Sequence, residues 1–450
     1  MPELRTSHLL LTGDSPQLRW WALGLSILGA LCVSLAFTEP LWLLGPIFVL
    51  LAFAGILARQ AAPLLLGLYP ALCVHHNLRL NVLFVLLGLL LLVLERAEEW
   101  EPAKSKAMAI AGLELGLVIA AVLALHPVPF ATHPVEAFGQ WLYDYSPVLL
   151  YVLIVRSGFS ARLVPMLVRL LLVAILAASV TVVVDGLLHP NTRAVGWVER
   201  MPTGTAYDLV MFVPIGLGMF ASGRSRVLGL ATALLALAAI FFTGSRAPFA
   251  VALLLALPFA RGQRWALPAL LAVLTLAMIQ TGGGIVSRMA SIEGEAGLID
   301  ASTLLRIVVW GLSIKILMLH PLLGIGFGQF ISYASSLFIF DEFLLGHSHN
   351  IVLEKMVQVG IPLALFYLAL IGLLLRRNWR TYRALRDRLD RADVELFRGL
   401  FFGALAMLAC GALDAVLNGS NQPLAFWMIM ALLTVWTEGL GRTQVREAGQ

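Results

Sequence analysis

Residues 206–260 read AYDLVMFVPIGLGMFASGRSRVLGLATALLALAAIFFTGSRAPFAVALLLALPFA. Only short polar connections separate the three apolar runs in this stretch, and they carry Arg224, Arg226 and Arg246. A helix needs about 20 predominantly apolar residues to cross the hydrocarbon core of a bilayer. The stretch therefore predicts consecutive helices that cross a membrane back and forth.

The composition of the whole chain agrees with this interpretation. Of its 450 residues, 60% are hydrophobic and only 13% are charged, whereas water-soluble domains carry about 25% charged residues. A soluble enzyme, a disordered chain and a collagen-like fibre are therefore excluded. The net charge of +5 comes mostly from basic residues that flank apolar runs, as topology signals do. We therefore expect membrane lipids, and no nucleic acid, as partners.

The predicted fold is all-α, a single integral membrane domain over residues 1–450 with about 12 transmembrane helices. The candidate spans are the apolar runs at about 18–37, 41–58, 61–76, 80–94, 107–125, 140–156, 162–186, 206–221, 226–242, 247–260, 265–281, 351–375, 397–417 and 424–439. Several of these runs are short, so we expect some of them not to cross the membrane completely.

Basic residues in short loops mark the cytoplasmic side of a membrane protein. The basic loops are 96–106, 224–226, 261–264 and 376–391. Loop 126–139 has no lysine or arginine and is therefore expected outside. Alternation then places 187–205, 243–246 and 282–350 outside as well, with both termini in the cytoplasm.

The segment 282–350 is the one large loop that we predict outside the spans. Within it, Leu304 to Leu319 is nearly all apolar but contains Arg306 and Lys315. Such a segment is typical of a helix in the membrane interface whose basic groups stay at headgroup level. Pro321 follows and should end the helix.

Several arginines lie on the side where basic residues are expected to be rare. They are Arg193, Arg200, Arg246, Arg288 and Arg306. Arginine binds phosphate through a planar, bidentate guanidinium group, so convergence of these side chains would suit a lipid-linked diphosphate. The alternative is that each of them separately reaches the lipid headgroups.

The histidines of Gly346-His347-Ser348-His349-Asn350 are candidates for a general base. Asn350 is expected to cap the helix that starts at Ile351, and the positive end of that helix should keep a nearby imidazole neutral. A neutral imidazole can accept a proton. The two histidines alternate along the chain, so we expect them to point in different directions, with one facing the site.

Two alternatives concern the neighbours of these histidines. A metal site would need a third ligand besides His347 and His349, and no cysteine or carboxylate cluster lies nearby in the sequence, so no metal is expected. Glu354 either orients His349 or pairs with Lys355.

Three ordered motifs resemble the O-antigen ligase/polymerase family. They are Thr243-Gly244-Ser245-Arg246; His320-Pro321-Leu322-Leu323-Gly324-Ile325-Gly326-Phe327-Gly328, with Arg306 and Trp310 upstream; and His349-Asn350 with Leu353-Glu354 and Gly360. Arg193 with Gly196 and Pro202 also resembles an earlier motif of that family, and the resemblance covers about 190–360.

The resemblance implies a membrane-embedded glycosyltransferase of the GT-C-like type, with one large periplasmic loop. It implies transfer of a glycan from undecaprenyl diphosphate to an acceptor at the periplasmic face of the bacterial inner membrane, without metal, ATP or another cofactor. His349 would deprotonate the acceptor hydroxyl, and Arg193, Arg246 and Arg306 would bind the diphosphate. Arg200 and Arg288 are added by location alone. His347 is a second histidine that leaves the identity of the base open.

Within that family, a ligase transfers the glycan to the lipid A core of lipopolysaccharide, whereas a polymerase extends the glycan itself. Only one predicted external loop is long, which favours the ligase, with the O-antigen polymerase as the alternative. A secondary transporter for lipids or anions is the alternative of another class. It would predict inverted repeats, whereas the sequence has no internal symmetry and its arginines gather on one side.

Overall fold

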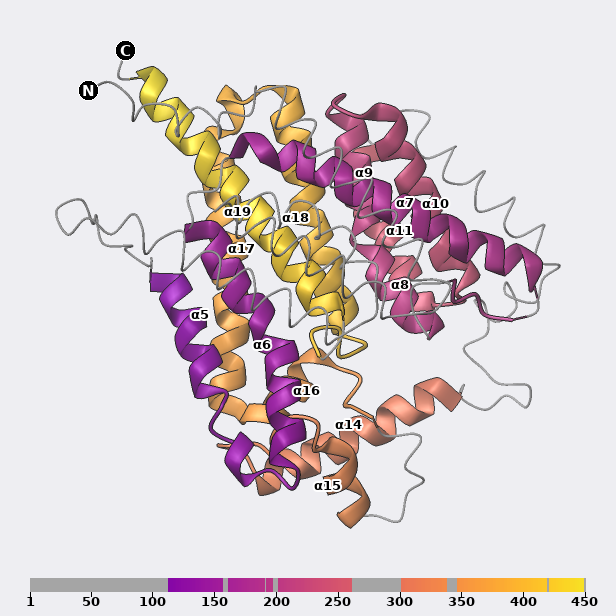
Figure 1. Cartoon of the computed structure of the whole chain (residues 1–450), viewed down its shortest axis with the longest axis vertical. Coiled ribbons are helices and arrows are strands. Elements are labelled where there is room, and N and C mark those ends of the chain that lie inside the picture. The colour runs from indigo at the N-terminus through magenta and orange to yellow at the C-terminus, as the bar shows by residue number, and fades with distance from the viewer. Residues whose placement is uncertain are drawn as a thin grey trace, which may run out of the picture.

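The computed structural model describes residues 112–156, 161–190, 192–196, 201–260, 301–337, 346–418 and 421–448, drawn in colour in Figure 1. These residues form α-helices and short 3-10 helices, and no strand occurs among them. The predicted class, an all-α polytopic membrane protein, is thus confirmed. The runs at 18–37, 41–58, 61–76, 80–94 and 265–281 lie outside the described residues, so the number of twelve spans stays a prediction.

The α-helices that correspond to the predicted spans follow the apolar runs closely. In the first half they are α5 (Gly112–Leu123), α6 (Pro134–Arg156), α7 (Val164–Leu188), α8 (Pro202–Val210), α9 (Phe212–Ala221), α10 (Arg226–Phe242) and α11 (Arg246–Ala260). In the second half they are α17 (Ile361–Leu385), α18 (Arg391–Gly411) and α19 (Asn421–Ala448). Among the described residues, 6 helical stretches are long and apolar enough to cross a membrane. They are Gly112–Phe130, Ala161–Leu188, Pro202–Ala221, Ile361–Arg388, Arg391–Gly411 and Gln422–Gly441.

Loops that we predicted on the external side lie together at one end of the bundle. His126 Nε2, after α5, lies 3.0 Å from the carbonyl oxygen of Leu323. Arg193 Nε, after α7, donates to the carbonyl oxygen of Thr243 at 2.7 Å. Each contact joins two loops that are far apart in the sequence and that we expect on the same side of the membrane.

Loops that we predicted on the cytoplasmic side meet at the other end. Arg224, before α10, forms an ion pair with Asp393 in the first turn of α18. Arg398 donates to the carbonyl oxygen of Pro258, near the end of α11, at 2.7 Å. Among the described residues, the basic connection at 224–226 and the start of α18 therefore share one end of the bundle, opposite to the end that carries the histidines.

Three helices that are not among the candidate membrane spans of the structure lie at the histidine-bearing end (Figure 1). They are α14 (Ala301–Leu319), α15 (Phe330–Leu337) and α16 (Ile351–Val359). One side of α14 packs against α16 through a small apolar cluster that includes Val309, Ile316 and Val357. Its other side exposes apolar residues such as Ile307 and Met318. The helix therefore has one buried and one exposed apolar side, and it ends two residues before Pro321.

The predicted span at 351–375 is not continuous, because the chain breaks at Gly360. Its φ of +83° ends α16, and α17 starts at Ile361. The break accommodates the loop after α14, whose Leu322 carbonyl oxygen would lie 2.0 Å from a Cβ atom at position 360. The prediction of one continuous span failed because the apolar pattern continues through Gly360. The backbone that approaches this glycine belongs to Leu322, which is distant in the sequence.

Replacing Gly360 by alanine should therefore lower the stability of the protein. The new Cβ atom would clash with backbone and would hold a left-handed conformation, which costs about 1–3 kcal/mol for a residue other than glycine. We expect a lower unfolding temperature in detergent. Gly372→Ala, within α17, is the matched control, because a Cβ atom added there would have no atom within 4 Å. Equal unfolding temperatures for the two variants would contradict this account.

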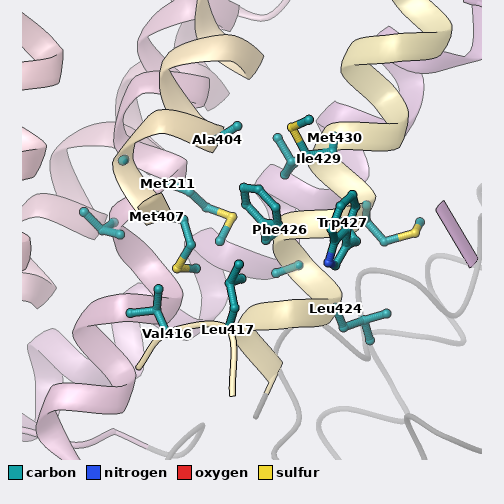
Figure 2. Close-up of a cluster of buried hydrophobic side chains, with 14 of the residues drawn as sticks. Met211, Ala404, Met407, Val416, Leu417, Leu424, Phe426, Trp427, Ile429 and Met430 are labelled. Carbon is teal, nitrogen blue, oxygen red and sulfur yellow. The ribbon is translucent and has the colours of Figure 1, made fainter. Parts of the chain in front are cut away.

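The core behind the histidine-bearing end is made by α8, α9, α18 and α19. Figure 2 shows Met211, between α8 and α9, together with Met407 of α18 and Phe426 and Trp427 of α19. All four side chains are buried. Close packing of this kind fixes the loop between α18 and α19, since Leu417 of that loop is buried in the same cluster.

Candidate functional site

The histidine segment is anchored to the start of α16 by its cap. Asn350 accepts hydrogen bonds from the backbone nitrogens of Val352 at 2.9 Å and Leu353 at 3.1 Å. The predicted N-cap is therefore present. The side-chain amide nitrogen of Asn350 also donates to the carbonyl oxygen of Ala412 at 2.8 Å. This bond connects the histidine segment to the end of α18.

Both histidine rings face the same carboxylate. His349 Nδ1 lies 3.2 Å and His347 Nδ1 3.7 Å from Oδ1 of Asp414, and the ring centroids are 4.1 Å apart. The expectation that the rings point in different directions is therefore wrong. Side chains two positions apart share a face even in an extended segment, and the left-handed backbone of His349, with a φ of +49°, sets how closely the two rings approach.

Asp414 lies in the loop between α18 and α19 and is mostly buried. Burial raises the pKa of its carboxyl group, but the hydrogen bond from His349 and the two imidazoles outweigh that effect, and the net pKa is lowered. Its Oδ1 also accepts from the backbone nitrogen of Ala415 at 2.8 Å, and it hydrogen bonds to Tyr207 of α8. Asp414 is thus an ionised, fixed partner of the histidines.

This role of Asp414 was not predicted from the sequence. The carboxylate lies 65 residues from His349, and nothing in the local pattern links the two. Its position at the end of a predicted span was the only available signal.

The tautomers of the two histidines follow from their partners. A carboxylate only accepts hydrogen bonds, so His349 Nδ1 carries a proton and its Nε2 has the free lone pair. His347 Nδ1 accepts from the backbone nitrogen of His349 at 3.2 Å, which places the proton of a neutral His347 on Nε2. Burial, then the neighbouring His349, lowers the pKa of His347, and this imidazole is therefore neutral near pH 7.

Glu354 holds the histidine segment from the first turn of α16. Its Oε2 accepts from the backbone nitrogen of Ser348 at 2.7 Å. Its Oε1 accepts from Gln358 and from Asn418, each at 2.9 Å. Of the two alternatives for this residue, pairing with Lys355 is wrong, and contact with the histidine segment is observed.

Lys355 instead forms a buried ion pair with Asp144 of α6. Its Nζ lies 2.5 Å from Oδ2 of Asp144, and the two side chains are 2% and 0% exposed. Lys355 also donates to Gln358 at 3.1 Å. The pair therefore connects α6 to α16 through the same glutamine that contacts Glu354.

Replacing Lys355 by methionine should destabilise the protein strongly. Removing one partner of a buried ion pair leaves an uncompensated charge and costs about 3–5 kcal/mol. Thermal unfolding in detergent would measure the loss. The double variant Asp144→Asn/Lys355→Met is the control, because it removes both charges and should recover most of the stability. A double variant no more stable than the single one would refute the charge explanation.

Arg306 approaches the histidines from α14. Its positive charge contributes to the lowered pKa of His347. Its Nε is buried and has no hydrogen-bond partner among the described residues. One turn further along α14, Trp310 donates to the carbonyl oxygen of His349 at 3.4 Å. The guanidinium group is thus close enough to act electrostatically on His347, and one of its nitrogens is available to a ligand.

Arg193 and Arg246 belong to two loops that brace one another. Arg193 Nε donates to the Thr243 carbonyl oxygen, and its Nη2 donates to the Ser245 hydroxyl at 3.0 Å. These bonds fix the turn at Gly244, where φ is +64°, and Arg246 begins α11 directly after it. The structure therefore brings the segments of these two predicted arginines together. Arg193 holds the turn, and Arg246 follows that turn directly.

Helix α8 connects the arginine loops to the histidine pair. Thr205, in its first turn, donates to the carbonyl oxygen of Val195 at 3.0 Å, and Tyr207, two residues on, contacts Asp414. The loops that carry Arg193 and Arg246 are therefore joined through α8 to the end of the bundle that carries the histidines. Arg200 and Arg288 lie outside the described residues.

The site also contains three potential metal ligands. Donor atoms of His347, His349 and Asp414 all lie within 4.8 Å of one another. We expected no metal because the sequence offers no third ligand near the histidine pair. The fold supplies a third potential ligand, Asp414, from a distant loop, so the lack of a ligand nearby in the sequence does not decide the question.

Fold and site together define a multi-pass helical membrane protein with a histidine–aspartate pair and arginines at one end of its spans. The O-antigen ligase family model matches residues 231–368. This match supports the family predicted from the three motifs, and it includes Arg246, Arg306 and His349. It implies an activity of the O-antigen ligase or polymerase type, with a lipid-linked glycan among the substrates. No curated protein matches the chain.

Proposed function

We propose that the protein is an O-antigen ligase that transfers a glycan from undecaprenyl diphosphate to the lipid A core of lipopolysaccharide. The observation that carries the proposal is the convergence of His349, Asp414 and Arg306 at one end of the spans. A base with a fixed tautomer beside a guanidinium group suits glycosyl transfer from a diphosphate, which needs both a proton acceptor and a stabilised leaving group.

His349 is the general base of this mechanism. Its Nδ1–H donates to Asp414, so Nε2 can take the proton of the acceptor hydroxyl. The hydroxyl oxygen then attacks the anomeric carbon with inversion, the glycosidic bond to the diphosphate breaks, and undecaprenyl diphosphate leaves. His347 is the weaker candidate because its Nδ1 already accepts from the backbone. Asp414 acts as a positioning residue that also stabilises the imidazolium formed in the step.

Arginine side chains stabilise the negative charge that grows on the diphosphate as it leaves. Arg306 has an unpartnered Nε beside the histidines, and Arg246 is presented by the turn that Arg193 holds. We assign Arg246 and Arg306 to direct binding of the diphosphate and Arg193 to positioning of Arg246. Arg200 and Arg288 remain candidates from their location in the sequence.

The proposed setting is the bacterial inner membrane, with both termini in the cytoplasm. The histidine-bearing end then faces the periplasm, where the glycan carrier presents its diphosphate. The segment 282–350 forms the large periplasmic loop of a single membrane domain, and its α14 lies at the headgroup level. Neither a metal nor ATP takes part in the proposed reaction, because the diphosphate itself is the activated leaving group.

An acceptor assay with the purified full-length protein tests this function. The protein is given a lipid-linked glycan together with lipid A core, in the presence of EDTA and without ATP. A ligase should attach the glycan to the core. Lengthening of the carrier-bound glycan would identify an O-antigen polymerase instead. Movement of intact lipid-linked glycan between leaflets that survives His349→Ala, with neither product formed, would support a transporter.

A further inference from the structure

The cluster of His347, His349 and Asp414 has a geometry that its proposed catalytic role does not require. In that role, only the contact between His349 and Asp414 is used. Yet the second imidazole lies with its Nδ1 3.7 Å from the same oxygen atom. The three donor atoms therefore form a triangle and not a simple pair.

The size of this triangle fits a transition-metal ion. Zinc binds histidine nitrogen and carboxylate oxygen at about 2.0–2.2 Å in a tetrahedral arrangement, so two of its ligand atoms are about 3.4 Å apart. The two distances from Asp414 Oδ1, 3.2 and 3.7 Å, lie on either side of that value. Three protein ligands would leave a fourth position open for water.

The surroundings of the cluster are compatible with a cation. The three side chains are 34%, 23% and 13% exposed, so an ion could enter without unfolding of the loop. Arg306 adds a positive charge near His347, and Glu354 adds a negative charge. With the carboxylate of Asp414, these charged side chains near the two imidazoles sum to about one negative charge, which favours a divalent cation.

We infer that His347, His349 and Asp414 form a three-ligand site for Zn²⁺ or a similar transition-metal ion, and that the bound ion inhibits glycan transfer. The binding follows from the donor geometry, and it requires Nδ1 of His347 to give up the 3.2 Å hydrogen bond that it accepts from the backbone nitrogen of His349. The inhibition rests on the proposed function. A neutral imidazole carries one proton. When a metal occupies Nδ1 of His349, that proton resides on Nε2, which can then no longer accept the proton of the acceptor hydroxyl.

Metal binding is tested first, without any activity measurement. Full-length protein in detergent is treated with EDTA, freed of the chelator and titrated with Co²⁺, whose visible absorption reports tetrahedral coordination. We expect one Co²⁺ per chain, displaced by Zn²⁺. His347→Asn and Asp414→Asn should each weaken binding at least about tenfold. His133→Asn is the matched control, because that exposed histidine lies outside the cluster at the same end.

Thermal unfolding measurements identify variants that fail to fold. Zn²⁺ should raise the unfolding temperature of the wild-type protein and of His133→Asn, because a ligand that binds only the folded state stabilises it. At the same Zn²⁺ concentration the increase should be clearly smaller for His347→Asn and Asp414→Asn, while all four proteins unfold cooperatively without metal. Absence of a Co²⁺ band in the wild type, or an undiminished band in His347→Asn, would overturn the site.

Inhibition is tested second, in the acceptor assay. Zn²⁺ at a concentration that saturates the Co²⁺-binding site should stop transfer, and excess EDTA should restore it. If Zn²⁺ saturates the site while transfer continues, the metal site stands and the proposed role of His349 is refuted. If the protein transfers glycan but binds no Co²⁺, the proposed function stands and the metal site is refuted.

Discussion

The variant His349→Ala should lose glycan transfer while the protein still inserts into the membrane and folds. A positioned general base contributes about 10²–10⁴-fold to the rate of a reaction, and no other group in the described site has the same arrangement. His347 cannot replace it readily, because its Nδ1 accepts a hydrogen bond from the backbone of residue 349. The measurement is the initial rate of attachment of glycan to lipid A core by purified protein.

Two further variants separate loss of the base from loss of the loop conformation. Residue 349 has a φ of +49°, which asparagine tolerates better than alanine. His349→Asn should therefore keep the backbone and be as inactive as His349→Ala. His133→Ala removes an exposed histidine from the same end of the molecule and should keep full activity. Substantial transfer by His349→Asn would exclude this imidazole as the base.

Sequence periodicity and composition were sufficient to predict most of the described spans. The run predicted at 226–242 coincides with α10, and the run at 247–260 differs from α11 by one residue. Such agreement is expected where the bilayer dictates both the length and the apolar character of a helix. The same rule failed at Gly360, because hydropathy carries no information about a contact with the loop after α14.

The candidate site could be predicted only where its chemistry is local. Asn350 caps α16 through hydrogen bonds within three residues, and the sequence pattern indicated that cap correctly. Asp414 escaped the prediction because its partner, His349, lies in another loop. The brace between Arg193 and Ser245 likewise joins residues 52 positions apart. These contacts depend on how the spans pack, which one sequence does not reveal.

The shared direction of the two histidines was open to prediction, whereas their common partner was not. Side chains two positions apart lie on one face of an extended segment, so the spacing of His347 and His349 favoured a shared direction. The observed segment is nevertheless irregular, since Ser348 is held by Glu354 and residue 349 is left-handed. The close approach of both rings to Asp414 therefore follows from these tertiary contacts and not from spacing alone.

The variant Arg246→Lys should impair transfer severely although it keeps the positive charge. The guanidinium group is a planar fork that binds two oxygen atoms of a phosphate at once, whereas an ammonium group is a compact point charge. Loss of one donor that stabilises the charge of a transition state costs about 10²–10³-fold in rate. We expect a loss of at least about tenfold for lysine, which retains part of the electrostatic effect, and about 10²–10³-fold for Arg246→Ala.

The matched control for this prediction is Arg226→Lys. Arg226 begins α10 as Arg246 begins α11, but it lies at the opposite end of the bundle from the histidines. If arginine matters at both positions only because it anchors the start of an apolar helix, the two lysine variants should lose the same fraction of activity. If Arg246 binds the diphosphate, its variant alone should lose transfer, and its KM for the lipid-linked glycan should rise more than its KM for the acceptor.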